Sequence, residues 1–213
     1  MKPRVILLSQ SPARRRLLRR ILPRFRTARP LGVDERQEQR EFERARPLRE
    51  VRDAIALARH LSQLKARSWP EKHVDQVVIA ADQLLFLPRS RRVLGKPGGR
   101  VAALRQLRAM QLEPAVLVTA VTVRHGARLW TATQRVRLRV RPELATSDLR
   151  RVLELDQPWD CAGSFKMESR APEILAWIRS DDPTGIEGLP LIRTAALLKL
   201  AALSVASRRE GPR

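Results

Sequence analysis

The chain is poor in cysteine, in glycine-rich motifs and in long apolar runs, and each shortage excludes a class of protein. Cys161 is the only cysteine among 213 residues, so neither an internal disulfide nor a cysteine-built metal site can form. No Walker-type or Rossmann glycine pattern occurs. No apolar run approaches the roughly 20 residues that a membrane-spanning helix requires. The segment MKPRVILLSQ has too short an apolar core for a signal peptide, so we expect a cytoplasmic protein with no membrane partner.

Acidic residues are also scarce relative to basic ones. The chain has 22 Asp and Glu against 43 Lys and Arg, which gives a net charge of +21. Such an excess favours a polyanionic partner such as nucleic acid. The basic residues are nevertheless spread along the whole chain, and only six of them are lysines, a bias that GC-rich codon usage produces without any binding. A solvated basic surface and nonspecific nucleic-acid binding therefore both stay open.

Strand-like and helix-like segments alternate along the chain, which predicts an α/β protein. We expect strands over residues 4–9, 77–87, 115–123 and 134–142, the last two as an antiparallel pair whose second strand turns alternate arginines to solvent. We expect helices from residue 12, where Ser11 suits the N-cap, and over 48–67, 100–110, 146–156 and 188–203. The charged segment 29–47 is predicted to be a loop.

Asp82 directly follows the apolar run VVIAA, which makes it the first candidate for chemistry. Ligands in α/β sheets gather beyond the carboxyl ends of strands, and we expect Asp82 at or just beyond such an end. Because burying an unpaired carboxylate costs on the order of several kcal/mol, Asp82 requires a metal, a cation or a proton. A capping or salt-bridged aspartate is the alternative interpretation.

Phosphate-binding groups gather where the first strand leads into the first helix. Ser9 and Ser11 place hydroxyls and free backbone N–H groups at a helix start, which is a favourable site for an anion. Arg14 and Arg15 add forked donors that match phosphate oxygens. The neighbouring Arg16 is predicted to lie on the surface.

Further along the chain, cations and carboxylates recur in a consistent order. Lys65 falls at the end of the apolar face of the second helix, where it either extends to solvent or points into a cleft. Lys96 lies in a Gly-Lys-Pro turn just past the Asp82 strand. Asp34 and Glu35 supply acidic groups that could hold a divalent cation with Asp82. Cations for phosphates and carboxylates for a metal are the groups that phosphoryl-transfer chemistry uses.

In this order the motifs resemble the Maf family of nucleotide pyrophosphatases, over about residues 4 to 200. They read S-x-S-P-x-R-R, D-E, L-x-x-K-A, D-Q, G-K-P, D-C-A-G-S-F-K-x-E and G-L-P-L, and correspond to Ser9–Arg15, Asp34–Glu35, Leu61–Ala66, Asp82–Gln83, Gly95–Pro97, Asp160–Glu168 and Gly188–Leu191. Asp-Gln and the CAGSFKxE block look most like the branch that hydrolyses 7-methyl-GTP.

The resemblance implies a fold and a reaction. The fold is a mixed twisted sheet flanked by helices, similar to inosine triphosphate pyrophosphatases, with a cleft between two lobes of one domain over residues 1–205. Residues 206–213 are predicted from their own sequence to be a disordered tail. The reaction is Mg²⁺- or Mn²⁺-dependent hydrolysis of a nucleoside triphosphate to the monophosphate and pyrophosphate, in a homodimer. Asp82 matches the proton acceptor and, with Glu35, the metal site. The phosphate site matches Ser9, Arg14, Arg15, Lys65 and Lys96.

Base choice in the related branch is set by positions that correspond here to Ala13, Gln83 and Glu168. A carboxylate at 168 accepts from the N1–H and exocyclic amine of guanine and repels the acceptor edge of thymine or uracil. An aromatic ring would favour the positive charge of a methylated guanine. The branch often has an aromatic residue where this chain has Ala13, and Trp159 or Trp177 are candidates to replace it.

The chain also departs from the family at several glycines. The family commonly has Ser-Gly and Thr-Gly where this chain has Gln111-Leu112 and Thr119-Ala120, and it has glycine where this chain has Ser169 and Ala171. A bulkier residue in place of glycine can block a positive φ angle or the close approach of a ligand. Hydrolysis of 7-methyl-GTP is the leading hypothesis. A different base preference (dTTP, UTP or another modified nucleotide) and a nucleic-acid-binding protein with lost catalysis are the alternatives.

Overall fold

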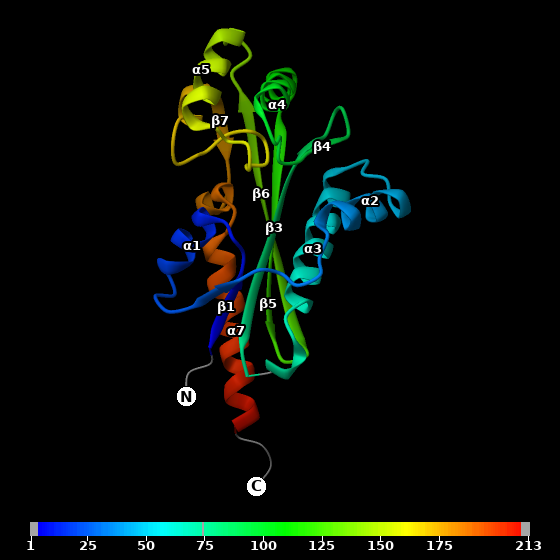
Figure 1. The fold of residues 1–213 in the computed structure, drawn as a ribbon, viewed down its shortest axis with the longest axis vertical. Coiled ribbons are helices and arrows are strands. Elements are labelled where there is room, and N and C mark those ends of the chain that lie inside the picture. The colour runs from blue at the N-terminus through cyan, green and yellow to red at the C-terminus, as the bar shows by residue number, and fades with distance from the viewer. Residues whose placement is uncertain (1–3, 74, 210–213) are drawn as a thin grey trace.

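The computed structural model describes residues 4–73 and 75–209, and within them a seven-stranded mixed sheet forms the centre of the molecule (Figure 1). The strand order is β2-β1-β3-β5-β6-β7, with β4 pairing separately with β3. Strands β3 (Val77–Leu87), β5 (Ala115–His125) and β6 (Arg128–Val140) are long and antiparallel, and run through both halves of the molecule. The predicted α/β class with a helix-flanked mixed sheet is confirmed.

In the half that holds the N-terminus, β1 (Val5–Leu8) pairs in parallel with β2 (Arg26–Ala28) and β3. Helices α1 (Pro12–Arg19) and α7 (Leu191–Arg209) cover one face of the sheet through buried leucines such as Leu17 and Leu197. Helix α3 (Val51–Arg67) covers the other face. A two-sided core of this kind explains why β1 and the first part of β3 are continuous apolar runs.

In the other half, β4 (Arg92–Leu94) pairs with the end of β3, and β7 (Leu175–Arg179) forms the far edge beside β6. Helices α4 (Arg100–Leu112), α5 (Thr146–Asp156) and α6 (Ala171–Ile174) pack on one face. The predicted alternation of β6 is confirmed, since Val136, Leu138 and Val140 are buried while Arg135 and Arg137 are exposed.

Local chemistry fixes the start of α1 where the sequence predicts it. The Ser11 side chain accepts a hydrogen bond from the backbone N–H of Arg14 at 3.3 Å, and Pro12 occupies the first turn. The start of α7 is held by a short 3-10 helix, η2 (Pro183–Glu187). Buried Asp182 accepts from the N–H of Thr184 and from the N–H of Ile192, which joins η2 to α7.

The segment 29–47, predicted to be a loop, contains helix α2 (Glu35–Ala45). None of its residues is buried, and for this reason the apolar periodicity that reveals a helix is missing. Asp34 caps its N-terminus, and the Arg46 guanidinium donates to Asp53 at 2.8 Å, which ties its end to α3 and lowers the pKa of Asp53.

Two more differences concern the edges of the sheet and the C-terminal end of the chain. The short strands β2, β4 and β7 are not predicted from the sequence, because edge strands of three to five residues carry little apolar pattern. Helix α7 extends to Arg209, over the first part of the expected tail, and residues 210–213 lie outside the described residues. Among the helices that the structure describes, none has the length and apolarity to cross a membrane.

Candidate active site

A cavity of 1490 Å³ lies at a notch in the sheet. Pairing between β1 and β3 ends at Leu8 and Ala80, and pairing between β4 and β3 begins only at Leu94 and Leu85. We call the intervening edge of β3, residues 81–84, the notch. Six segments line the cavity around it: residues 8–16, residues 29–39, the C-terminal part of α3, residues 93–96, residues 160–168 and residues 186–188.

Asp82 was expected at or just beyond the end of its own strand, and the structure corrects this position. Asp82 does not lie at the end of its own strand, since β3 continues to Leu87. Instead the neighbouring parallel strand β1 ends at Leu8, so Asp82 stands beyond the carboxyl end of β1. Successive side chains of a strand point to opposite faces, so Asp82 faces α3 while Gln83 faces η2. The notch therefore opens the cavity to both faces of the sheet.

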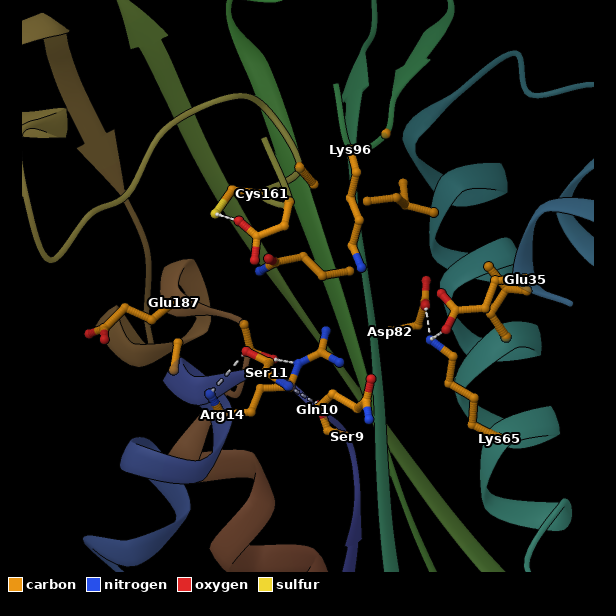
Figure 2. Close-up of a pocket in the computed structure, with 18 of the residues that line it drawn as sticks. Ser9, Gln10, Ser11, Arg14, Glu35, Lys65, Asp82, Lys96, Cys161 and Glu187 are labelled. Atoms are coloured by element: carbon orange, nitrogen blue, oxygen red, sulfur yellow. Dashed lines mark hydrogen bonds and ion pairs between the residues drawn. The ribbon is translucent and has the colours of Figure 1, made fainter. Parts of the chain in front are cut away.

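Asp82, Lys65 and Glu35 meet on the α3 side of the notch (Figure 2). The Lys65 ammonium donates to Asp82 Oδ1 at 2.6 Å and lies 2.8 Å from Glu35 Oε1. The side chains of Lys65 and Asp82 are only 5% and 7% exposed, whereas that of Glu35 is 49% exposed. Lys65 thus points into the cavity, and the buried carboxylate has the counter-charge that its burial requires.

Asp34 does not join this group. Its Oδ1 accepts from the backbone N–H groups of Arg36 and Gln37 at 3.0 and 3.1 Å, which directs the carboxylate to the start of α2. Glu35, the first residue of α2, turns to Lys65 instead. Over the described part of the chain, no group of three or more His, Cys, Asp or Glu side chains could hold a metal ion. Glu35 and Asp82 are the two carboxylates that contact the Lys65 ammonium.

Ser9, Ser11 and Arg14 lie across the cavity from Lys65 (Figure 2). Ser9 Oγ accepts from the Ser11 N–H at 3.2 Å, which fixes the turn into α1. Arg14 Nε donates to the Gly188 carbonyl at 2.9 Å, and its Nη1 donates to the Ala81 carbonyl at 2.8 Å, which β1 leaves unpaired at the notch. Burial lowers the pKa of the Arg14 guanidinium, and the nearby Asp82 and Glu35 carboxylates oppose that shift.

Arg15 and Arg16 differ in their relation to the cavity, although Arg16 has the exposed side chain that the sequence predicts. Arg15 is absent from the described cavity lining, whereas Arg16 is part of it. On a helix, residue 14 shares a face with the buried Leu17 and Leu18, and residue 15 is rotated by about 100° from residue 14. Arg16 reaches the rim, where its Nη2 donates to a Glu187 carboxylate oxygen at 2.7 Å.

The predicted specificity residues all line the cavity, in the company of Glu187. Glu168 lies 3.5 Å from Arg16, so one guanidinium faces two carboxylates. Gln83 donates to Thr119 Oγ1 at 2.8 Å and to the Gly185 carbonyl at 2.9 Å. Sequence reasoning missed Glu187, although its position directly before the Gly-Leu-Pro-Leu motif was a usable signal.

The aromatic residue that lines the cavity is Phe165. Neither Trp159 nor Trp177 is part of the described lining, so the expectation that one of them replaces an aromatic at Ala13 is wrong. Trp159 packs on the core under α4 and α5, and Trp177 lies on the edge strand β7.

The residues that stand where the family has glycine do not strain the fold. None of Gln111, Leu112, Thr119, Ala120, Ser169 and Ala171 has a positive φ, so a side chain causes no backbone strain there. Thr119 bonds Gln83, and Ser169 donates to Asp156 at 2.6 Å, so both contribute hydrogen bonds.

Gly163, in contrast, has a φ of +83° that disfavours other residues. A Cβ there would lie 2.6 Å from Leu85 Cδ1 and 3.1 Å from Phe165 Cε1. We expect Gly163→Ala to lower the free energy of unfolding by about 1–3 kcal/mol in urea titrations. Gly95→Ala, where a Cβ meets nothing within 4 Å, is the control. An equal effect of both substitutions would refute the assigned close approach.

Lys96 extends from the β4–α4 turn into the cavity (Figure 2).

Cys161 also lines the cavity. Burial, followed by the neighbouring Asp160, raises the pKa of the Cys161 thiol to about 12. Because the thiolate is the reactive form, we expect iodoacetamide to modify Cys161 at pH 8 at least about tenfold more slowly than free cysteine. Mass spectrometry of timed samples measures the rate, and modification as fast as that of free cysteine would contradict it.

Comparisons with known proteins agree with the motifs. A family model described as Maf-like protein matches residues 4–201. The chain is 36% identical over 198 residues to the 7-methyl-GTP pyrophosphatase of Syntrophotalea carbinolica, covering 91% of this chain and 92% of that protein. It is 37% identical over 201 residues to the 7-methyl-GTP pyrophosphatase of Xanthomonas oryzae pv. oryzae, covering 94% and 97%.

Among solved structures, the Staphylococcus aureus Ham1 protein aligns with a TM-score of 0.41 and 12% identity over 78% of this chain and 88% of that chain. The match over residues 4–201 confirms the resemblance carried by the sequence motifs. The chain therefore belongs to the family of Maf-like proteins.

Proposed function

We propose that this protein hydrolyses 7-methyl-GTP to 7-methyl-GMP and pyrophosphate. The observation that carries the proposal is the buried pair of Asp82 and Lys65 at the notch, across the cavity from the serines and Arg14. The names of the relatives support the reaction and the base.

The residues around Asp82 have distinct roles in the proposed reaction. Asp82 takes a proton from the water that attacks the phosphorus, and Lys65 orients the carboxylate and offsets its charge. Ser9 and Ser11 bind the triphosphate oxygens through hydrogen bonds. Arg14 and Lys96 bind them as well, and the positive charges of these two side chains offset the charge of the transition state. Water supplies its oxygen to one phosphoryl group, and the bridging oxygen leaves with the other.

A divalent cation, Mg²⁺ or Mn²⁺, belongs to the proposal. Glu35 Oε1 and Asp82 Oδ1 both lie within 3 Å of the Lys65 ammonium, so the two carboxylates are within reach of a shared cation. Two protein oxygens complemented by substrate phosphates and water fit the way Mg²⁺ is bound in phosphate-transferring sites. When bound, the cation supplies positive charge to the phosphate oxygens.

Base recognition is assigned to the opposite end of the cavity. Glu168, Glu187 and Arg16 together carry one net negative charge there, which suits the positive charge of a 7-methylated guanine. Gln83 and Phe165 complete the wall. The acidic end and the cationic end thus match the two ends of the substrate.

Chromatography of the products tests the proposed reaction. With 7-methyl-GTP and Mg²⁺, we expect 7-methyl-GMP and pyrophosphate in equal amounts, and loss of both when EDTA removes the cation. Release of 7-methyl-GDP and orthophosphate would refute the assigned cleavage position. Undiminished turnover in EDTA would refute the role of the cation.

A further inference from the structure

Outside the cavity, one face of the β6–β7 edge concentrates arginine. Arg135, Arg137 and Arg139 alternate along β6, and their register places Arg137 opposite Arg179 and Arg139 opposite Trp177 on β7. Directly opposed residues of an antiparallel pair point to the same side of a sheet. We call this set of five residues the arginine face. It lies in the half of the molecule that holds α4 and α5, at the β7 edge (Figure 1).

Three of the four arginines of the arginine face are exposed and, in the described part of the chain, lack neutralising carboxylates, whereas Arg139 is half-buried and its Nη2 donates to the Gln111 carbonyl at 3.4 Å. Arg135, Arg137 and Arg179 are exposed, and the reverse side of β6 packs Val136 and Leu138 into the core. Within the residues that the structure describes, no carboxylate forms an ion pair with these three arginines. Two acidic side chains of this half pair elsewhere, Glu154 with Arg100 and Glu173 with Arg151 and Arg170.

The cross-strand pair of Arg137 and Arg179 is unfavourable in the protein alone. Like charges directly opposite each other on neighbouring strands destabilise a sheet. A polyanion that lies along the two strands relieves this repulsion, so the charges on this face are complementary to such a partner. The +21 net charge assists its approach over longer distances.

The position of Trp177 indicates which kind of polyanion fits the arginine face. The Arg179 guanidinium carbon lies 5.4 Å from the centre of the Trp177 ring, so ring and guanidinium form one surface next to Arg137 and Arg139. Aromatic rings and arginine planes set in a basic groove or sheet bind single strands, because unpaired bases can stack on them. We propose that the arginine face binds single-stranded nucleic acid. None of its residues is part of the described cavity lining, so this activity is separate from nucleotide hydrolysis.

Fluorescence anisotropy of a labelled 12-nucleotide oligo-U tests the proposal, with the full chain in 50–200 mM KCl. Three arginines are replaced in the variant Arg135→Ser/Arg137→Ser/Arg179→Ser. The matched control Arg105→Ser/Arg108→Ser/Arg150→Ser removes the same charge from exposed positions of α4 and α5, which cover the other face of the sheet.

We expect the arginine-face variant to bind at least about tenfold more weakly at 100 mM KCl, with a salt slope smaller by about 2, since each phosphate contact to a single strand contributes about 0.7. The control should change affinity less than about threefold. Trp177→Ala should weaken binding about fivefold or more without altering the salt slope. Both triple variants should keep wild-type 7-methyl-GTP hydrolysis, and Arg179→Ser alone should raise Tm because it removes the like-charge pair.

Three results would overturn the proposal. One is the absence of wild-type binding at 50 mM KCl. Another is an equal loss of affinity in both triple variants, which would mean that the charge acts diffusely. The third is equal binding of a 12-base-pair duplex, which would exclude a role for base stacking on Trp177. Each outcome is independent of whether the cavity hydrolyses nucleotides.

Discussion

Asp82→Asn is expected to reduce 7-methyl-GTP hydrolysis about 10²- to 10⁴-fold, because an amide cannot take the proton of the attacking water. The fold should persist. Glu35 still lies 2.8 Å from the Lys65 ammonium, so the buried cation keeps a carboxylate partner. Pyrophosphate release measures the activity, and thermal unfolding followed by circular dichroism measures the stability.

Asp181→Asn is the matched control for this substitution. Asp181 has a 70% exposed side chain, and it pairs with Arg193 away from the notch. We expect its turnover to stay within about twofold of the wild type. Near-wild-type turnover of Asp82→Asn would remove Asp82 from the proton-accepting role and leave it as a structural partner of Lys65.

Lys65→Met is expected to lower both activity and stability. The substitution leaves the Asp82 carboxylate buried without its counter-charge, which costs about 3–5 kcal/mol when one partner of a buried pair is removed. The carboxylate also loses the hydrogen bond from Lys65 that fixes its orientation in the site. We expect turnover at pH 7, measured by pyrophosphate release, to fall at least about 100-fold.

The double variant Lys65→Met/Asp82→Asn separates the two effects. Removing the stranded carboxylate should restore a large part of the stability lost in Lys65→Met, while activity stays absent. Lys72→Met, in the 3-10 helix η1 (Glu71–His73), is the control for loss of a lysine outside the cavity. Strictly additive losses of stability in the double variant would contradict the assigned ion pair.

Residues whose environment is set locally were predictable from the sequence. Ser11 and Pro12 mark the start of α1 because a hydroxyl cap and a proline act within one helical turn. Lys65 falls on the apolar face of α3 by its spacing from Leu61, and this face packs on the strand that carries Asp82. The sequence therefore identified Lys65 and Asp82 as site residues, but it did not show that they contact each other at 2.6 Å.

Features that depend on distant segments were not predictable in the same way. The notch arises because β1 and β4 cover different parts of β3, which no local pattern indicates. Arg16 is held at the cavity rim by its hydrogen bond to Glu187, a residue 171 positions away in the chain, so no local pattern indicates the contact. Helix α2 was not predicted because it buries no residue, so its sequence lacks the apolar periodicity of a packed helix.

The catalytic efficiency, kcat/KM, for a panel of nucleoside triphosphates tests the central claim most directly. The panel contains 7-methyl-GTP, GTP, dTTP, UTP and CTP, each with Mg²⁺ and with Mn²⁺. We expect the highest value for 7-methyl-GTP, at least about tenfold above GTP, because Glu168 and Glu187 favour a positively charged base. A higher value for dTTP, UTP or CTP, or no turnover of any triphosphate, would contradict it.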